Sequence, residues 1–216
     1  MRQLSKIILI LIFLLFCSKE AYSAVRGGIE YSIPIDYSKL SQHELELKAH
    51  ENFYLAQRYK DGFLSEEITK ALNIYEILEH IEPQKSIYCI KQGVLYAKLG
   101  KDRYAKGAFS KAISTEKNNP EAYYEFGNFY YKRESYRKAL KYYNEAYKHG
   151  METNYDMLEK MGDIYEKLGD TRSALKYLNL AKEQSPNENL ENQILRIQNN
   201  DAVNNEFYST TRIHKP

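Results

Sequence analysis

The chain has 216 residues, of which 43% are hydrophobic and 28% charged, and this balance excludes a disordered chain. With only 10 glycines and 5 prolines the sequence offers few turns, which argues against a many-stranded β fold and favours helices. The formal net charge of +2 gives no case for a nucleic-acid-binding surface.

The N-terminal 23 residues have the layout of a secretory signal peptide. Arg2 and Lys6 precede an apolar run over 7–16, and small residues stand at Ala21 and Ser23. The run is shorter than the roughly 20 residues that span a bilayer. We expect cleavage after Ser23 and a periplasmic or secreted, nearly neutral mature protein. An uncleaved signal segment would instead anchor the protein in the membrane.

Residues 24–42 alternate apolar and polar side chains around Pro34, which predicts an extended N-terminal segment. Its role stays open between a flexible tether and a segment that docks on the rest of the chain or pairs with a partner's strand. The sequence SQHE at 41–44 then predicts a capping box that opens the first helix. Cys89 would be the single cysteine of the mature chain, so no intramolecular disulfide is expected.

Five sequence columns recur in register between residues 93 and 181, at spacings of 34 and then 35 residues. The extra residue falls in the turn-like stretch 149–154. The columns are a glycine, a tyrosine, an alanine, a large apolar residue and a second alanine: Gly93/Gly127/Gly162, Tyr96/Tyr130/Tyr165, Ala105/Ala139/Ala174, Phe109/Tyr143/Leu178 and Ala112/Ala146/Ala181. Upstream, Ala71, Tyr75 and Leu78 continue the pattern.

This pattern resembles the tetratricopeptide repeat, in which two helices form each unit of about 34 residues. The resemblance implies an all-α fold, a right-handed α-solenoid of antiparallel helix pairs. The expected parts are a divergent unit (43–85), three further units (86–119, 120–154 and 155–188), a capping helix (188–199) and a flexible tail (200–216). Gly100 and Gly169 are expected to end first helices. Asn119-Pro120 and Ser185-Pro186 are expected to begin helices.

In this family the concave face is lined mainly by the first helix of each pair, and it binds protein segments. Carried over by position, the resemblance predicts twelve groove residues: Ile87, Ile90, Val94 and Lys98, then Tyr124, Asn128, Tyr131 and Lys132, then Asp156, Glu159, Asp163 and Glu166. The three rows change from apolar through tyrosine-rich to acidic. They suit a peptide or protein partner with apolar and basic groups, although a solvated charged face is the simpler alternative.

Catalytic, metal and cofactor sites are not expected. The sequence contains no phosphate-binding glycine loop and no G-x-S-x-G or H-E-x-x-H motif, and its histidines lack nearby partners for a metal. The carboxylate clamp of some family members would need basic residues where Ile90, Val94 and Glu159 stand. We therefore expect a non-catalytic scaffold or adaptor of the cell envelope. The alternatives are a glycan-binding or enzyme-accessory module that uses groove tyrosines, and a self-assembling oligomer.

Overall fold

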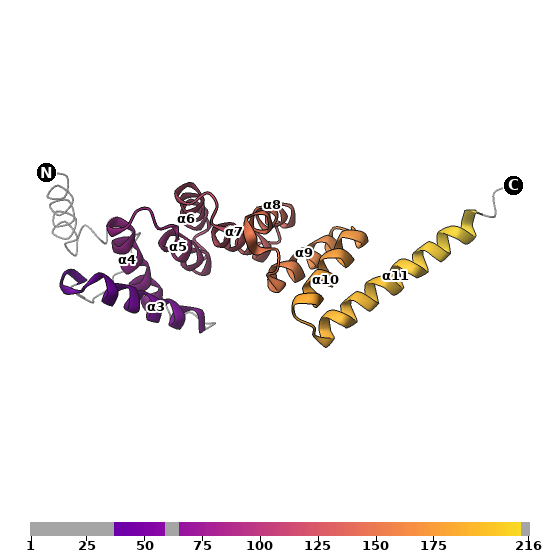
Figure 1. Ribbon diagram of the computed structural model, residues 1–216, viewed down its shortest axis with the longest axis horizontal. Helices are drawn as coiled ribbons and strands as arrows, with labels where there is room; N and C mark the ends of the chain where they lie inside the picture. The colour runs from indigo at the N-terminus through magenta and orange to yellow at the C-terminus, as the bar shows by residue number, and fades with distance from the viewer. Residues whose placement is uncertain (1–36, 59–64, 213–216) are drawn as a thin grey trace. The chain divides into compact units, whose positions relative to one another are not determined.

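The computed structural model describes residues 37–58 and 65–212 (Figure 1). The expected signal peptide, and residues 24–36 of the expected extended segment, lie outside these ranges. The described part is helical with short connections and contains no strand. Its elements are η1 (Tyr37–Lys39), α3 (Gln42–Arg58), α4 (Ser65–Ile81), α5 (Ser86–Lys98), α6 (Asp102–Thr115), α7 (Pro120–Lys132), α8 (Tyr136–Ala146), η3 (Tyr147–Met151), α9 (Tyr155–Lys167), α10 (Thr171–Gln184) and α11 (Glu188–Arg212).

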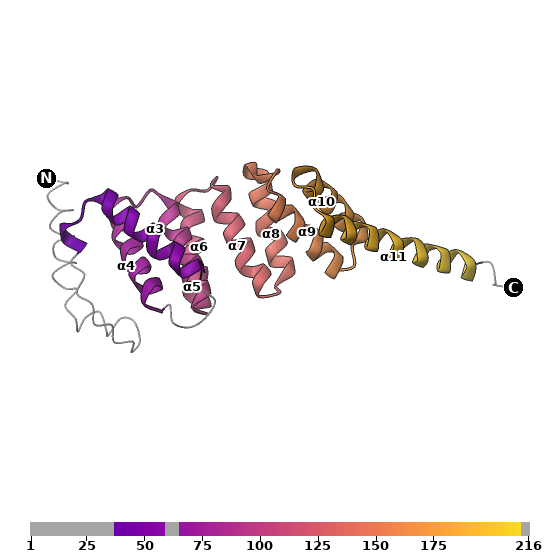
Figure 2. The ribbon, with the colours of Figure 1, turned by 90° about the horizontal axis from the view of Figure 1, so that it is seen from below.

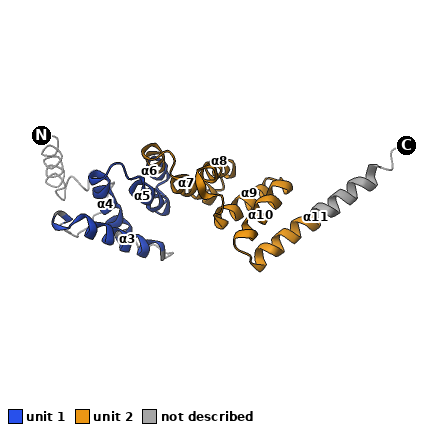
Figure 3. Cartoon of the chain, in the orientation of Figure 1, with its two compact units in different colours: residues 1–108 blue, residues 109–216 orange. Residues whose placement is uncertain are grey.

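The chain forms two compact units, residues 1–108 and 109–216, and the boundary falls within α6 (Figure 3). In the first unit α3 packs against α4, and both contact α5. Residues 37–40 are not extended, because Tyr37–Lys39 form a single 3₁₀ turn whose flanking Leu40 packs with Tyr37 against the core of this unit. The capping box is present, since Glu44 Oε2 accepts from the Ser41 backbone N–H at 2.7 Å.

The second unit consists of helix hairpins that pack on one another. α7 pairs with α8, α9 pairs with α10, and α8 contacts α9, while α11 packs against α10 (Figure 2). Four of its helices begin with a side-chain cap: Asn119 accepts from the Glu121 N–H, Asn154 from the Met157 N–H, Asp170 from the Ser173 N–H and Asn187 from the Leu190 N–H. These caps satisfy backbone donors that the first helical turn leaves free.

The repeat columns form the core. Both alanine columns are fully buried in all three units, as are the large side chains Phe109, Tyr143 and Leu178. The glycine column explains how closely the helices of a pair approach. A Cβ at Gly127 would lie 2.4 Å from Cδ1 of Tyr143, and one at Gly162 would lie 2.6 Å from Cδ2 of Leu178. In the pairs α7–α8 and α9–α10, the sequence columns are therefore the contacts between the two helices.

The tyrosine column stacks ring on ring with the second helix of its own unit. Tyr130 lies parallel to Tyr142 with 5.5 Å between ring centroids, and Tyr165 lies parallel to Tyr177 at 5.4 Å. In the repeat 86–119 the residue equivalent to Tyr142 is Ala108, and the ring of Tyr96 instead contacts that of Tyr104 in a tilted arrangement, with 5.4 Å between centroids. Such offset aromatic pairs stabilise a contact beyond the area that they bury.

The first helix ends in the same backbone turn in each of the three repeats, 86–119, 120–154 and 155–188. Gly100 and Gly169 have positive φ, as expected, and Glu134 adopts the same conformation with φ of 54°. In each turn the next amide donates to the carbonyl five residues back, at the tyrosine of the repeat, with distances of 2.9–3.0 Å. This is the hydrogen bond of the Schellman motif.

The one extra residue between the repeats 120–154 and 155–188 is accommodated at the C-terminal end of α8. Residues Tyr147–Met151 form a π-helical turn, and Gly150 has φ of 108°. One added residue widens an α-helix locally into such a turn. The repeat therefore returns to register at Tyr155.

The C-terminal helix begins at Glu188, the expected first residue of the capping helix, but it differs from the expectation in its cap and in its end. Its cap is Asn187 rather than Ser185, because Asn187 Oδ1 accepts from the Leu190 N–H at 2.8 Å. It also does not stop at Asn199, because the helix continues to Arg212 through most of the expected flexible tail. No glycine or proline occurs between 187 and 212, so no backbone preference ends the helix there.

Candidate functional site

The first predicted row, on α5, does not line an open surface. Ile90 is completely buried, and Ile87 and Val94 are half-buried. The exposed Lys98 side chain donates to the Ala56 carbonyl oxygen on α3. Ile90 was therefore wrongly predicted as a contact residue: it faces the core because α5 in this unit is covered by both α3 and α4.

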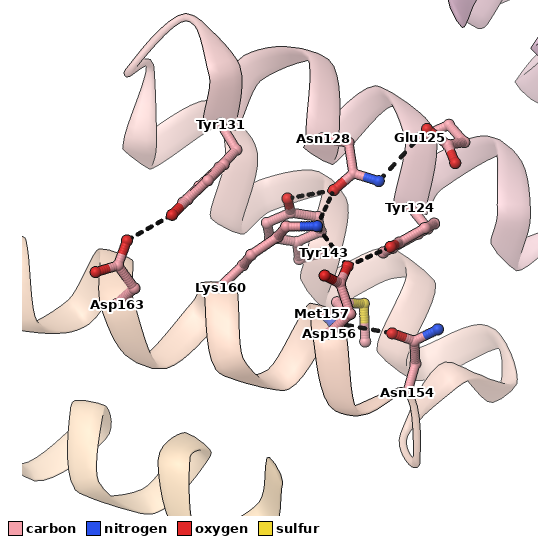
Figure 4. A network of polar contacts seen from close by, with 10 residues as sticks. All are labelled: Tyr124, Glu125, Asn128, Tyr131, Tyr143, Asn154, Asp156, Met157, Lys160 and Asp163. Carbon is pink, nitrogen blue, oxygen red and sulfur yellow. Dashed lines mark hydrogen bonds and ion pairs between the residues drawn. The ribbon is translucent and has the colours of Figure 1, made fainter. Parts of the chain in front are cut away.

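The second and third rows meet face to face across α7 and α9. The Tyr131 hydroxyl donates to Asp163 Oδ2 at 2.6 Å, and the Tyr124 hydroxyl donates to Asp156 Oδ2 (Figure 4). In both pairs the residues are 32 positions apart. The second hydrogen bond therefore repeats the geometry of the first, about two helical turns further along α7 and α9. The groove tyrosines and groove carboxylates predicted as separate rows thus form one continuous ladder.

A buried polar centre lies between the two rungs. Asn128 is 9% exposed, and its Oδ1 accepts from the Tyr143 hydroxyl at 2.8 Å and from Lys160 Nζ at 3.2 Å (Figure 4). Its Nδ2 contacts Glu125 at 3.4 Å. Because Tyr143 comes from α8 and Lys160 from α9, this amide joins three helices. A buried polar group with partners on several elements favours one particular packing arrangement.

Two lysines compensate two of the four predicted carboxylates. Lys160 forms an ion pair with Asp156 one turn earlier on α9, and its Nζ also lies 5.7 Å from the centroid of the Tyr124 ring. Lys167 pairs with Asp163 at 3.4 Å. These i, i+4 pairs relieve the repulsion that like charges on one helix face would cause.

Glu166 is also compensated, by α11. Its Oε1 lies 2.7 Å from Arg196 Nη2, and its Oε2 accepts from Gln193 Nε2 at 2.9 Å. Sequence reasoning missed both residues of α11, since the positions before and after the buried Ile194 read simply as a polar outer surface. The sequence carried one indication of their position: Gln193 stands one residue before the buried Ile194 and Arg196 stands two residues after it, at the edge of the buried stripe of α11.

Glu159 is different, because no hydrogen bond or ion pair joins its carboxylate to another described residue. It is half-buried and lines a cavity of about 470 Å³ together with Tyr131, Asp156, Lys160, Asp163, Lys167 and Gln193. Three carboxylates and two ammonium groups therefore surround this cavity. Lys132, the remaining predicted residue, is exposed at the end of α7.

The titration behaviour follows from the hydrogen bonds. Burial raises the pKa of Asp156, but the hydrogen bonds from Lys160 and Tyr124 outweigh burial and hold this pKa below its usual value. Burial and a carboxylate acceptor both raise the pKa values of Tyr124 and Tyr131. The tyrosines are therefore neutral donors and Asp156 is a charged acceptor at neutral pH.

The described residues hold no group of three histidines, cysteines or acidic residues placed to bind a metal ion. Cys89 is buried, 2% exposed, among core side chains of α5. In the same part of the chain, no helix is long and apolar enough to cross a membrane. The chemistry that the α7–α9 face can perform is recognition through hydrogen bonds and charge.

Comparison with known proteins agrees with the repeat geometry. A family model described as the tetratricopeptide repeat matches residues 120–148 and 155–188. A TPR repeat-containing protein of Dictyostelium discoideum is 33% identical over 85 residues, a match that spans 38% of this chain and 32% of that relative.

Solved structures share the fold at low identity. The crystal structure of MamA superposes with a TM-score of 0.56 at 18% identity, over 65% of this chain and 82% of MamA. PilW, described as a widely conserved type IV pilus biogenesis factor, gives a TM-score of 0.56 at 16% identity, over 69% of this chain and 67% of PilW. The fold class is thus an all-α repeat of helix hairpins. The chain therefore has the tetratricopeptide-repeat fold, and the repeat itself is matched over residues 120–148 and 155–188. This fold commonly serves as a scaffold for protein–protein interaction.

Proposed function

We propose that the protein is an exported, non-catalytic scaffold that binds a segment of a protein partner on the face formed by α7 and α9. The observation that carries this proposal is the uncompensated Glu159 in a cavity whose other carboxylates are paired. A half-buried carboxylate without a partner is electrostatically unfavourable in the free protein. A basic group from outside would satisfy it.

The surroundings of Glu159 define the guest. The Tyr131 and Tyr124 hydroxyls already donate to Asp163 and Asp156, so they fix the walls of the cavity. The unpaired carboxylate of Glu159 would repel a carboxylate guest, and Lys160 and Lys167 are already paired with Asp156 and Asp163. A lysine or arginine side chain of an extended or helical partner segment fits these constraints better than an acidic C-terminus does.

The place of action is proposed to be the cell envelope. The arrangement of residues 1–23 supports export, as argued from the sequence. PilW, which shares the fold, is described as a pilus biogenesis factor, and an envelope role for the present chain is compatible with that likeness. A protein partner in an envelope assembly is thus the proposed ligand.

The test is affinity capture from native envelope extract with matched variants. Glu159→Lys reverses the charge in the cavity, and Glu183→Lys makes the same change on an exposed position of α10 away from it. Partners that wild type and Glu183→Lys retain but Glu159→Lys loses would support the proposal. Their capture should also weaken with added salt, because partly exposed charges are screened over about 8 Å at physiological ionic strength. Partners captured equally by all three proteins would contradict it.

Glu159 is a sharper target than the other predicted carboxylates. Substitution of Asp163 would also break its hydrogen bond with Tyr131, and substitution of Glu166 would also break its contacts with α11. Loss of binding in those variants could therefore follow from altered packing. Glu159 has no such internal contact among the described residues.

A further inference from the structure

The acidic row on α9 ends in a contact made by the chain itself. Glu159 and Glu166 are seven residues apart, so they face the same side of α9 about 10.5 Å apart along its axis. Glu159 has no partner in the described part of the chain, whereas both carboxylate oxygens of Glu166 are occupied by Arg196 and Gln193. The two carboxylates are equivalent in position and differ in what covers them.

The helix that supplies this contact is firmly held. Leu190, Ile194 and Ile197 of α11 are 1–6% exposed and pack in one cluster with Leu158, Leu178 and Ala181. Arg196 and Gln193 lie on the polar side next to this stripe, and the side chain of Arg196 is itself 56% exposed. Its guanidinium is therefore free to leave Glu166 without any movement of the helix. Gln193 also lines the cavity that contains Glu159.

We infer that Arg196 and Gln193 are specificity-determining residues: they occupy Glu166 and thereby limit the binding face to one free carboxylate, at Glu159, for a partner's basic side chain. This inference rests on the function proposed above. The contact is an arginine–carboxylate pair of the kind that a partner would make, so Arg196 competes with a second basic residue of the partner for Glu166. Removal of Arg196 should open a second subsite.

The spacing of the two carboxylates determines which peptide should bind more tightly once Arg196 is removed. In a polyproline II segment, residues three apart lie on the same side and are separated by about 9 Å, which is close to the spacing of Glu159 and Glu166 on the helix. A peptide with two arginines three positions apart therefore reaches both carboxylates once Arg196 is gone. A peptide with one arginine contacts only one of the two carboxylates at a time in either protein.

The experiment measures binding of two synthetic peptides by titration at low salt. Both peptides are neutral apart from their arginines; one carries a single arginine and the other carries two, three positions apart. The proteins are wild type, the single variants Arg196→Ala, Lys182→Ala and Glu159→Gln, and the double variant that combines Arg196→Ala with Glu166→Gln. Lys182→Ala is the matched control, since it removes one positive charge and one ion pair, at 3.1 Å with Glu191, between α10 and α11 but outside the cavity.

Arg196→Ala should bind the two-arginine peptide about two- to fivefold more tightly than wild type does, in line with the modest strength of partly exposed ion pairs. It should bind the one-arginine peptide like wild type. The gain should vanish when Glu166→Gln is combined with Arg196→Ala, which assigns it to that carboxylate.

The outcomes separate the two proposals. If wild type binds and Glu159→Gln does not, but Arg196→Ala shows no gain, the face is a binding site and the inference about α11 is wrong. An equal gain in Lys182→Ala would also overturn the inference, because net charge alone would explain it. If neither peptide binds any of the proteins, the proposed function and the inference both fail.

Discussion

At the scale of single residues, glycine is required where the two helices of a repeat touch. Gly127 lies against the ring of Tyr143, which is fully buried and bonded through its hydroxyl to Asn128. The ring has no room to withdraw, because α7, α8 and α9 all meet around it. A side chain at this position must therefore separate α7 from α8.

Gly127→Leu is expected to lower the free energy of unfolding by about 1–3 kcal/mol through overpacking. The measurement is the midpoint of urea unfolding. Gly107→Leu on α6 is the control, since a Cβ there meets nothing within 4 Å, and its midpoint should stay unchanged or rise. Equal midpoints for Gly127→Leu and wild type would mean that this contact is not tightly packed.

Glu134 holds a backbone conformation that suits glycine. It stands in the column of Gly100 and Gly169 with φ of 54°, and its side chain is exposed. Glu134→Gly removes the steric cost of a Cβ in this region and should raise the free energy of unfolding by up to about 1 kcal/mol. Gly169→Ala should lower it. Unfolding midpoints that moved in the opposite directions would contradict this account of the turn.

Asp156 links stability to pH. Its pKa is held below the value in the unfolded chain, so its stabilising contribution is complete above about pH 4 and is lost as pH falls through the folded-state pKa. Asp156→Asn should therefore be less stable than wild type at pH 7, and the difference should shrink toward pH 3. Urea midpoints at pH 7, 5 and 3 would check this, and a difference that is constant with pH would refute the assignment.

The same contacts change the expectation for Tyr124. Read as a groove residue, it would be replaceable without loss of stability. In the structure its hydroxyl donates to Asp156 and its ring contacts Tyr143, with 6.3 Å between centroids. Tyr124→Ala would therefore weaken the contact between α7 and α9 as well as the binding face.

At the scale of helices, the start of α11 separates two possible caps. Asn187→Ala removes the acceptor of the Leu190 N–H and should cost about 0.5–2 kcal/mol in unfolding free energy. Ser185→Ala should have little effect, because Ser185 lies at the C-terminal end of α10 and accepts no bond from the first turn of α11. If Ser185→Ala proved the more costly change, the helix would begin at Pro186 as the sequence pattern suggested.

At the scale of the whole molecule, the repeats supply the apolar contacts that form the core. Each hairpin buries its alanine columns and its large apolar column, and neighbouring hairpins cover what remains. The terminal helix α11 covers the last hairpin with Leu190, Ile194 and Ile197. Apolar contacts between neighbouring helices therefore form the core of the second unit.

Export of the whole chain can be measured directly. Expression of the full sequence in a bacterial host should give a periplasmic product whose mature N-terminus is Ala24, which intact mass spectrometry would show. Retention of residues 1–23 would contradict cleavage after Ser23 and favour the membrane-anchored alternative.

The sequence by itself determined the class of fold, the spacing of the repeat columns and several helix ends. These features depend on local chemistry: side-chain caps at Asn119, a left-handed turn at Gly100, and small residues at fixed intervals that only a paired helix can use. One position of that kind was hidden, because Glu134 adopts the glycine conformation without being a glycine. The hydrogen bonds around that turn hold it in place.

Only the tertiary structure decided which charges are available for binding. The acidic residues of α9 look alike in the sequence, but Asp156 and Asp163 are bonded to tyrosines of α7, and Glu166 is bonded to α11. The partners lie between 27 and 32 residues away in the chain. Such pairings depend on how neighbouring hairpins stack, which no local pattern specifies. What remains unpaired after this stacking, Glu159, was indistinguishable from its neighbours until the helices were in place.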